Sequence, residues 1–345
     1  MHGKVCLEFN AGETPLANHP TAITVARHSE SGTACKQFFF MELSSYLRVN
    51  DPSKEWVAGR LNDLLAEDSI VPAFPEVAGR LCIMAQNEDT TMDDFAAVIS
   101  LDPGLATRCV QIASSVAFGA RTIDNIGQAM MLIGVQQARR IALAVAAIGC
   151  FAGFKGAVDW RRFWFHNVLV ARLTDKISGI FRPATGMEYL AGLLHDVGKL
   201  MVEHYFRREF ERVVTLAAER NCNHADVERE VLGLDHTQIG AAMCDCMNIH
   251  PHVLRAVRFH HDSLNLEHTS DSHGDGGFLA TCISIADKLA NNRVSYIEQK
   301  DRVAQEIERS QEWKFLQRLF LPQKIVLNLE DDVKKAQEDL TAFLS

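Results

Sequence analysis

Helical periodicity is the dominant pattern in the chain from about residue 70 to its end. Apolar residues recur there at the i, i+3, i+4 and i+7 spacings of an amphipathic helix, and the alternation of a half-buried strand is almost absent. A weak alternation of that kind occurs in "TAITVA" (21–26), within residues 1–55, which follow neither pattern clearly. The pattern therefore predicts an all-α fold beyond this extension.

Capping signals give the limits of the predicted helices. Thr91 and Asp94 resemble a capping box, and Asp102 followed by Pro103 is typical of a helix start. A glycine-rich break, "GCFAGFKGAV" (149–158), separates short helices at 70–150 from a second run of helices. The second run is predicted at 159–181, 186–203, 207–220, 224–232, 236–247, 251–261 and 278–292.

These limits divide the chain into four segments. Residues 1–66 are an N-terminal extension of unknown role, and residues 67–150 form a subdomain of small helices. Residues 151–292 form the larger helical half, and the helices of 293–345 are expected to pack on the body. The expected architecture is a multi-helix bundle with an N-terminal small-helix subdomain.

Charge and cysteine content limit the binding partners and the cellular compartment expected for the chain. The 44 acidic and 35 basic residues give a net charge of −9, which opposes nonspecific attraction to nucleic acid or anionic lipid. The nine cysteines include no CxxC, so reduced thiols in the cytoplasm are expected. The longest apolar run, "IALAVAAIGCFA" (141–152), is shorter than the roughly twenty residues of a membrane span. Three arginine pairs are expected to be solvated helix faces: Arg139–Arg140, Arg161–Arg162 and Arg207–Arg208.

Ionisable side chains lie on the apolar faces of several predicted helices. His166 shares a face with apolar residues four, seven and eleven positions further on. His195 and Asp196 lie inside the apolar helix "YLAGLLHDVGKL", with Lys199 one turn later. The other inward candidates are His236 at one helix start, His260 and His261 at the end of the next helix, and Asp287 in the last.

Such a set of side chains has two explanations. A buried polar group without a partner costs roughly 1–3 kcal/mol, so a single inward histidine is usually a hydrogen-bonded core residue. Several ligand-type side chains from different helices of a bundle instead favour a metal site. Neutral imidazole and carboxylate suit Fe, Mn, Zn or Ni, whereas Ca requires oxygen ligands. The clustering alone leaves both explanations open.

The order of these residues resembles the H…HD…H…HH…D signature of the HD superfamily of metal-dependent phosphohydrolases, particularly its HD-GYP branch. The wider sequence, from roughly 67 to 292, is similar to the HDOD family, the HD-related output domains of bacterial signalling proteins. The similar segments are "FPEVAGRLCIMAQNED", "ISLDPGLATRCVQIASSVAFG", "TIDNIGQAMMLIGVQQARRIAL", "GLLHDVGKL", "LGLDHTQIGAAM" and "HPHVLRAVRFHHD".

The resemblance implies an HD-like helical bundle that holds one or two divalent ions. It assigns one ion to His166, His195, Asp196 and Asp287. It assigns a second ion to Asp196, His236, His260 and His261, with Asp196 shared. It also implies catalytic roles for Asp196 and for Lys199, which would steady charge on the phosphoryl oxygens.

Two features separate the chain from the HD-GYP phosphodiesterases. No Gly-Tyr-Pro follows the histidine pair, where "DSLNLEHTSD" stands instead, and HDOD proteins as a class resemble regulatory modules. We therefore expect a cytoplasmic signal-transduction module that binds a protein partner or a phosphate-containing small ligand, and neither nucleic acid nor a membrane. The alternative is an active metal-dependent phosphohydrolase or phosphodiesterase with a nucleotide-type substrate.

Overall fold

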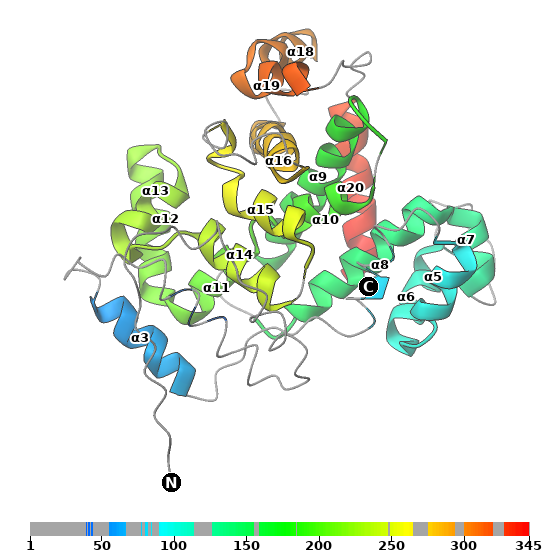
Figure 1. Cartoon of the computed structure of the whole chain (residues 1–345), viewed down its shortest axis with the longest axis horizontal. Helices are drawn as coiled ribbons and strands as arrows, with labels where there is room; N and C mark the ends of the chain where they lie inside the picture. Colours follow the sequence, from blue (N-terminus) through cyan, green and yellow to red (C-terminus); the bar gives the residue numbers. More distant parts are fainter. Residues whose placement is uncertain are drawn as a thin grey trace.

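The fold is built from α-helices (Figure 1). The computed structural model describes residues 55–66, 90–113, 126–154, 159–183, 185–247, 249–264, 275–293, 300–319 and 328–344, with seven single residues between 39 and 84. These residues contain helices and no strand, which confirms the predicted all-α class. The predicted strand-like "TAITVA" and most of the helix expected after Pro75 lie outside the described residues.

Among the described helices, those from α3 to α7 are short, and a longer apolar helix follows them. Their bounds are α3 Glu55–Ala66, α5 Met92–Ile99, α6 Pro103–Ala113, α7 Ile126–Ile133 and α8 Val135–Cys150. The predicted capping box at Thr91 and Asp94 is present, and the carboxylate of Asp102 accepts a hydrogen bond from the Leu105 N–H. In α8 every residue from Ile141 to Ile148 is buried, because this helix packs against α6, α10 and α20.

The remaining helices form the body of the molecule. Their bounds are α9 Trp160–Gly179, α10 Met187–Leu194, α11 Val197–Tyr205, α12 Arg207–Arg220, α13 His224–Leu232, α14 His236–Cys246, α15 Pro251–Phe259, α16 Asp275–Asn291, α18 Lys300–Arg309, α19 Gln311–Leu319 and α20 Leu329–Leu344. Helix α9 packs against α10, α16 and α20, and α14 packs against α11 and α15. In Figure 1, α12 and α13 flank this centre on one side and α5 to α8 on the other.

The predicted helix at 186–203 is wrong, because the chain forms two helices there. Helix α10 ends at Leu194 and α11 begins at Val197, so His195 and Asp196 lie at a junction and not inside a helix. The backbone of Asp196 leaves helical geometry, with φ −105° and ψ 4°. The change of direction lets α11 meet α14 at Gly198, where a Cβ atom would lie 1.9 Å from the carbonyl oxygen of His236.

The expected solvated face at Arg139–Arg140 is also corrected. Arg139 is buried, and its guanidinium donates to the Thr185 carbonyl at 3.0 Å. Arg140 forms an ion pair with the buried carboxylate of Asp175 on α9. Both arginines therefore link α8 to the body of the molecule through polar contacts.

The cysteines bear out the expectation of reduced thiols only in part. Among the described residues, the free cysteines are Cys109, Cys150, Cys222, Cys244 and Cys282. Cys246 is disulfide-bonded.

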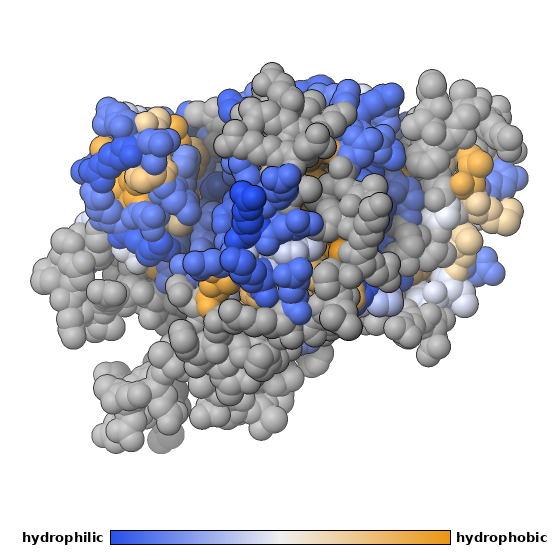
Figure 2. All heavy atoms as spheres, turned by 90° about the horizontal axis from the view of Figure 1, so that it is seen from above, coloured by the Kyte–Doolittle hydropathy of each residue, from blue (hydrophilic) through white to orange (hydrophobic). Residues whose placement is uncertain are grey.

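The surface is mainly hydrophilic on the face seen in Figure 2, with hydrophobic residues in small groups. Among the exposed hydrophobic residues are Met131 on α7 and Leu101 after α5. Within the described part of the chain, no helix combines the length and apolar character needed to cross a membrane.

Candidate metal centre

The structure brings the seven predicted ligand residues to one place between the helices. They come from five segments that are distant in the sequence. His166 lies on α9, His195 and Asp196 at the α10–α11 junction, His236 at the first residue of α14, His260 and His261 directly after α15, and Asp287 on α16. The seven residues therefore lie close together, as expected. Their role as metal ligands stays a prediction.

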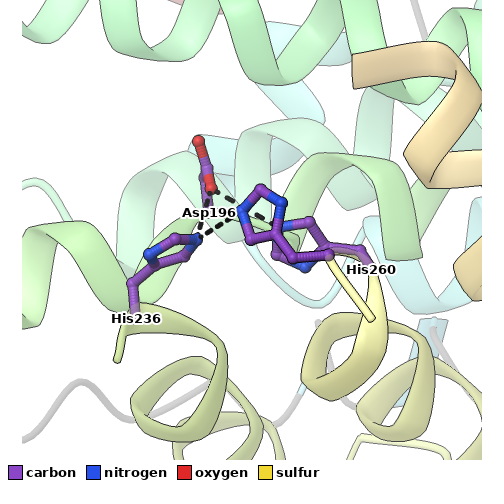
Figure 3. Close-up of side chains that lie close together, drawn as sticks. Asp196, His236 and His260 are labelled. Carbon is purple, nitrogen blue, oxygen red and sulfur yellow. Dashed lines mark hydrogen bonds and ion pairs between the residues drawn. The ribbon is translucent and has the colours of Figure 1, made fainter. Parts of the chain in front are cut away.

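Asp196 occupies the centre of the cluster, and its two oxygens face different histidines. Oδ1 lies 3.3 Å from His236 Nε2 and 3.9 Å from His260 Nε2. Figure 3 shows its carboxylate between the rings of these two residues, which come from different helices. Oδ2 lies 3.5 Å from His195 Nε2 and 3.9 Å from His166 Nε2.

The remaining contacts complete two overlapping groups of donor atoms. Asp287 Oδ1 lies 3.0 Å from His166 Nε2 and 3.8 Å from His195 Nε2. The Nε2 atoms of His236 and His261 are 3.1 Å apart. Among the described residues, the groups close enough to hold an ion are His166, His195 and Asp196, and Asp196, His236, His260 and His261. Asp287 lies beside the first group, which we name the α9 set, and we name the second the α14 set.

Hydrogen bonds fix the tautomers of two central histidines. His195 Nδ1 lies 2.7 Å from the Gly192 carbonyl oxygen, and His260 Nδ1 lies 2.8 Å from that of Val257. A carbonyl oxygen only accepts, so each Nδ1 carries the proton and each Nε2 presents a lone pair to Asp196. Such a bond from the second ring nitrogen is typical of metal-ligating histidines.

Unpartnered buried atoms test whether a cation fits the cluster. The Nε2 atoms of His195 and His260 and the Oδ1 atom of Asp196 are buried and have no hydrogen-bond partner. A core in which every histidine is hydrogen-bonded would not leave such atoms. Each buried polar atom without a partner costs roughly 1–3 kcal/mol of stability. Their convergence on a common centre, with imidazole and carboxylate donors, fits a divalent metal ion.

Electrostatics favour the protonation states that bind a cation at His195, His260, His261 and Asp196, whereas Glu228 outweighs burial and raises the pKa of His236. Burial holds the pKa of His195 below and that of His260 well below the ordinary value, and burial with the neighbouring His236 lowers that of His261 to about 4. Burial alone would raise the pKa of Asp196, but Lys199 and the surrounding histidines outweigh it and hold that pKa well below the usual value. Neutral imidazoles and an ionised carboxylate are the forms in which these side chains bind metal.

Two residues that support His236 were missed by the sequence reasoning. Glu228 on α13 is fully buried and contacts the His236 ring. Its place on the same helix face as Val231 and Leu232 could have indicated this burial from the sequence. Asp235 caps α14 by accepting from the Thr237 and Gln238 N–H groups, and the reciprocal bond with Gln238 completes a capping box.

The cluster reaches the surface on the side formed by α9, α11 and α16. The side chains of His166, Asp287 and Lys199 are 18%, 15% and 24% exposed, whereas those of His195, His236 and His260 are 1% exposed or less. The Nζ atom of Lys199 lies 2.6 Å from Asp196 Oδ2. A ligand arriving from this side would therefore meet Lys199 before the buried imidazoles.

The fold and the histidine–aspartate cluster define a helical protein of the HD type, and comparison with known families agrees. The HDOD domain model matches residues 71–263, which is more than half of the chain. The chain belongs to the HDOD family. Asp287 lies beyond the matched range.

Solved structures share this fold at low sequence identity. An HDOD domain protein of unknown function from Geobacter sulfurreducens is 21% identical, has a TM-score of 0.67 and covers 84% of this chain and 98% of its own. A candidate phosphohydrolase from Shewanella amazonensis SB2B is 20% identical with a TM-score of 0.60, over 83% and 97%. A candidate signal transduction protein from Marinobacter aquaeolei VT8 is 20% identical with a TM-score of 0.60, over 90% and 67%.

A curated relative is considerably longer than the region it shares with this chain. An uncharacterized protein of Treponema pallidum is 24% identical over 225 residues, which make up 63% of this chain. The matched region spans 40% of that relative's length.

Proposed function

We propose that the chain is a bacterial signal-transduction module that binds a phosphate-containing small ligand at a centre of one or two divalent ions. The observation that carries the proposal is the convergence of buried, unpartnered donor atoms from His195, Asp196 and His260. Membership of the HDOD family and the fold shared with a candidate signal transduction protein support the signalling role. A protein partner in the signalling pathway stays a prediction.

Each part of the cluster has a task in this proposal. The imidazoles and the two carboxylates hold the cation, and a divalent ion there supplies Lewis acidity toward a phosphoryl oxygen and toward water. Burial lowers the pKa of Lys199, but the carboxylates of Asp196 and Asp287 outweigh it and raise that pKa, so the ammonium stays charged. Lys199 lies at the exposed edge and donates to an oxygen of the bound phosphate.

A second candidate function is hydrolysis of a nucleotide-type phosphoester. The complete set of histidine and aspartate donors beside Lys199 favours it, since these groups would serve turnover as well as binding. The fold shared with a candidate phosphohydrolase supports the same view. The two candidates differ in whether a phosphodiester bond breaks after the ligand has bound.

The metal content of the purified chain tests the first part of the proposal, that the cluster binds divalent ions. We expect the purified protein to carry one or two divalent ions, and Asp196→Ala to lose them, because Asp196 belongs to both sets of donor atoms. Elemental analysis makes the measurement, and Asp331→Ala, which removes an exposed carboxylate on α20, is the control that keeps the metal. A wild-type chain that holds no ion after incubation with Mn, Fe, Zn or Ni contradicts the proposal.

Phosphate binding tests the role of Lys199. Calorimetric titration of the metal-loaded chain with inorganic phosphate is expected to show binding that Lys199→Ala weakens about 10- to 100-fold, the loss of one charge-assisted hydrogen bond. Lys335→Ala, on the exposed face of α20, serves as the control. Hydrolysis of a generic aryl phosphodiester in the same samples would favour the second candidate over the first.

A further inference from the structure

Glu228 holds the ring of His236 from the side opposite to Asp196. Its Oε2 atom lies 2.6 Å from His236 Nδ1 and 2.7 Å from the His236 backbone nitrogen. Both contacts come from one carboxylate oxygen, and the side chains of both residues are fully buried. Glu228 therefore fixes both the start of α14 and the orientation of the first imidazole on that helix.

This support differs in kind from that of the other central histidines. His195 and His260 each donate to a neutral backbone carbonyl, whereas His236 donates to a carboxylate. A carboxylate polarises the imidazole more strongly than a carbonyl does, so the opposite nitrogen becomes a better donor to a cation. The Nε2 atom of His236 is that nitrogen, and it lies 3.3 Å from Asp196 Oδ1.

The cost of burying Glu228 argues that its charge has a role beyond packing. Its other oxygen, Oε1, is buried without a hydrogen-bond partner. A buried carboxylate is more often neutral or replaced by an apolar residue unless a nearby positive group compensates it. A cation between Asp196, His236, His260 and His261 would supply such a compensating charge through the His236 ring.

We propose that Glu228 is a positioning residue that makes the α14 set the tighter of the two metal positions. The inference rests on the proposed function, because it requires that the cluster holds metal. It adds an order of binding to that proposal, with the α14 set filled before the α9 set. Glu228 touches neither the cation nor the ligand, and it acts through His236.

A titration with Mn²⁺ followed by electron paramagnetic resonance tests the inference. The wild-type chain is expected to bind Mn²⁺ in a tighter and a weaker phase. Glu228→Gln keeps the shape of the side chain and removes its charge, and it is expected to weaken the tighter phase about 10- to 100-fold while leaving the weaker phase unchanged. Glu230→Gln is the matched control, because this exposed residue of the same helix pairs with Arg220 at the surface and should change neither phase.

The possible outcomes separate the inference from the proposed function. Equal weakening of both phases by Glu228→Gln, or no weakening, would overturn the role of Glu228 and leave the metal centre intact. A wild-type chain that binds no Mn²⁺ would overturn the inference, and one that also binds no Fe, Zn or Ni would overturn the proposed function as well. If the variant does not fold, ¹⁵N resonances of the wild-type histidines decide: a proton on Nδ1 of metal-free His236 supports the inference, and a neutral ring that carries its proton on Nε2 alone overturns it.

Discussion

Arg140 shows how a single residue can reverse the expectation for a charged helix face. The pair Arg139–Arg140 has the spacing of a solvated surface, yet Arg140 reaches Asp175 on α9 and Arg139 reaches the Thr185 carbonyl before α10. Burial raises the pKa of Asp175, and the Arg140 charge acts against that rise. The arginine therefore compensates a buried carboxylate to which it is directly paired.

Removal of this arginine is expected to destabilise the fold. Arg140→Ala leaves the carboxylate of Asp175 without its partner, at a cost of about 1–3 kcal/mol in the free energy of unfolding. Arg207→Ala, which breaks an exposed pair with Glu211, should cost less than about 0.5 kcal/mol. Urea denaturation at neutral pH measures both, and equal stability of the two variants would contradict the prediction.

The same variant should respond to pH in a defined direction. Without Arg140 the folded-state pKa of Asp175 rises further above its unfolded value, so the folded chain binds the additional proton. A group of this kind loses stability as pH rises through its folded pKa and regains it as pH falls. The deficit of Arg140→Ala relative to wild type is therefore expected to shrink as the pH falls below neutral. A deficit that grows over this range would exclude the mechanism.

Many of the site residues could be predicted from the sequence. The histidines and aspartates lie on apolar helix faces, where a buried polar group without a partner is costly. His166 and Asp287 follow directly from that argument. Glu228 stood on such a face as well, but only the fold reveals that it meets His236, eight residues further along. Partners of a charge are set by packing between helices, which the periodicity of one helix does not encode.

The junction between α10 and α11 is the feature of element scale on which the site depends. Apolar residues continue through "YLAGLLHDVGKL", so the periodicity predicts one helix and hides the break. The break places His195 and Asp196 at the end of one helix and the start of the next. Gly198 was the available signal, since a glycine inside an apolar helix often marks a close approach of two backbones.

Substitution of this glycine tests the close approach. Gly198→Ala would place its Cβ atom 1.9 Å from the His236 carbonyl oxygen, so α11 and α14 must separate. We expect a loss of about 1–3 kcal/mol in unfolding free energy and weaker metal binding, because His236 moves away from Asp196. Gly149→Ala in α8 is the control: apart from the backbone of its own helix and its chain neighbours, nothing lies within 4 Å of the added Cβ, and the change should be neutral or slightly stabilising. Two variants of equal stability would contradict the prediction.

At the scale of the whole molecule, α20 joins two parts of the chain, which are the helices up to α8 and the body that begins with α9. It packs against α6 and α8 on one side and α9 on the other, and Leu340 and Phe343 are buried. Arg172 on α9 forms an ion pair with Asp339 at 2.7 Å, and Arg108 on α6 donates to the Phe343 carbonyl at 3.1 Å. The amphipathic pattern of this segment predicted its packing on the body, but not which helices it contacts.

Loss of this contact should reduce the cooperativity of unfolding. Phe343→Ala removes a buried ring and is expected to cost about 3–5 kcal/mol. Because the ring lies on the helix shared by both parts, calorimetry should resolve a broader or split transition in the variant and a single transition in wild type. Lys335→Ala, on the exposed face of α20, is the control. A single sharp transition in Phe343→Ala would show that the two parts are coupled elsewhere.

Asp287 comes from α16, beyond the last residue that the family model matches. A fragment cut at residue 263 would retain the histidine pair yet leave His166 without its acidic neighbour at 3.0 Å. Such a fragment would assemble only part of the cation's surroundings, and a negative binding assay on it would not describe the intact polypeptide. Recombinant fragments of this chain should therefore keep α16, and also α20, which packs against α9, rather than end at the edge of sequence similarity.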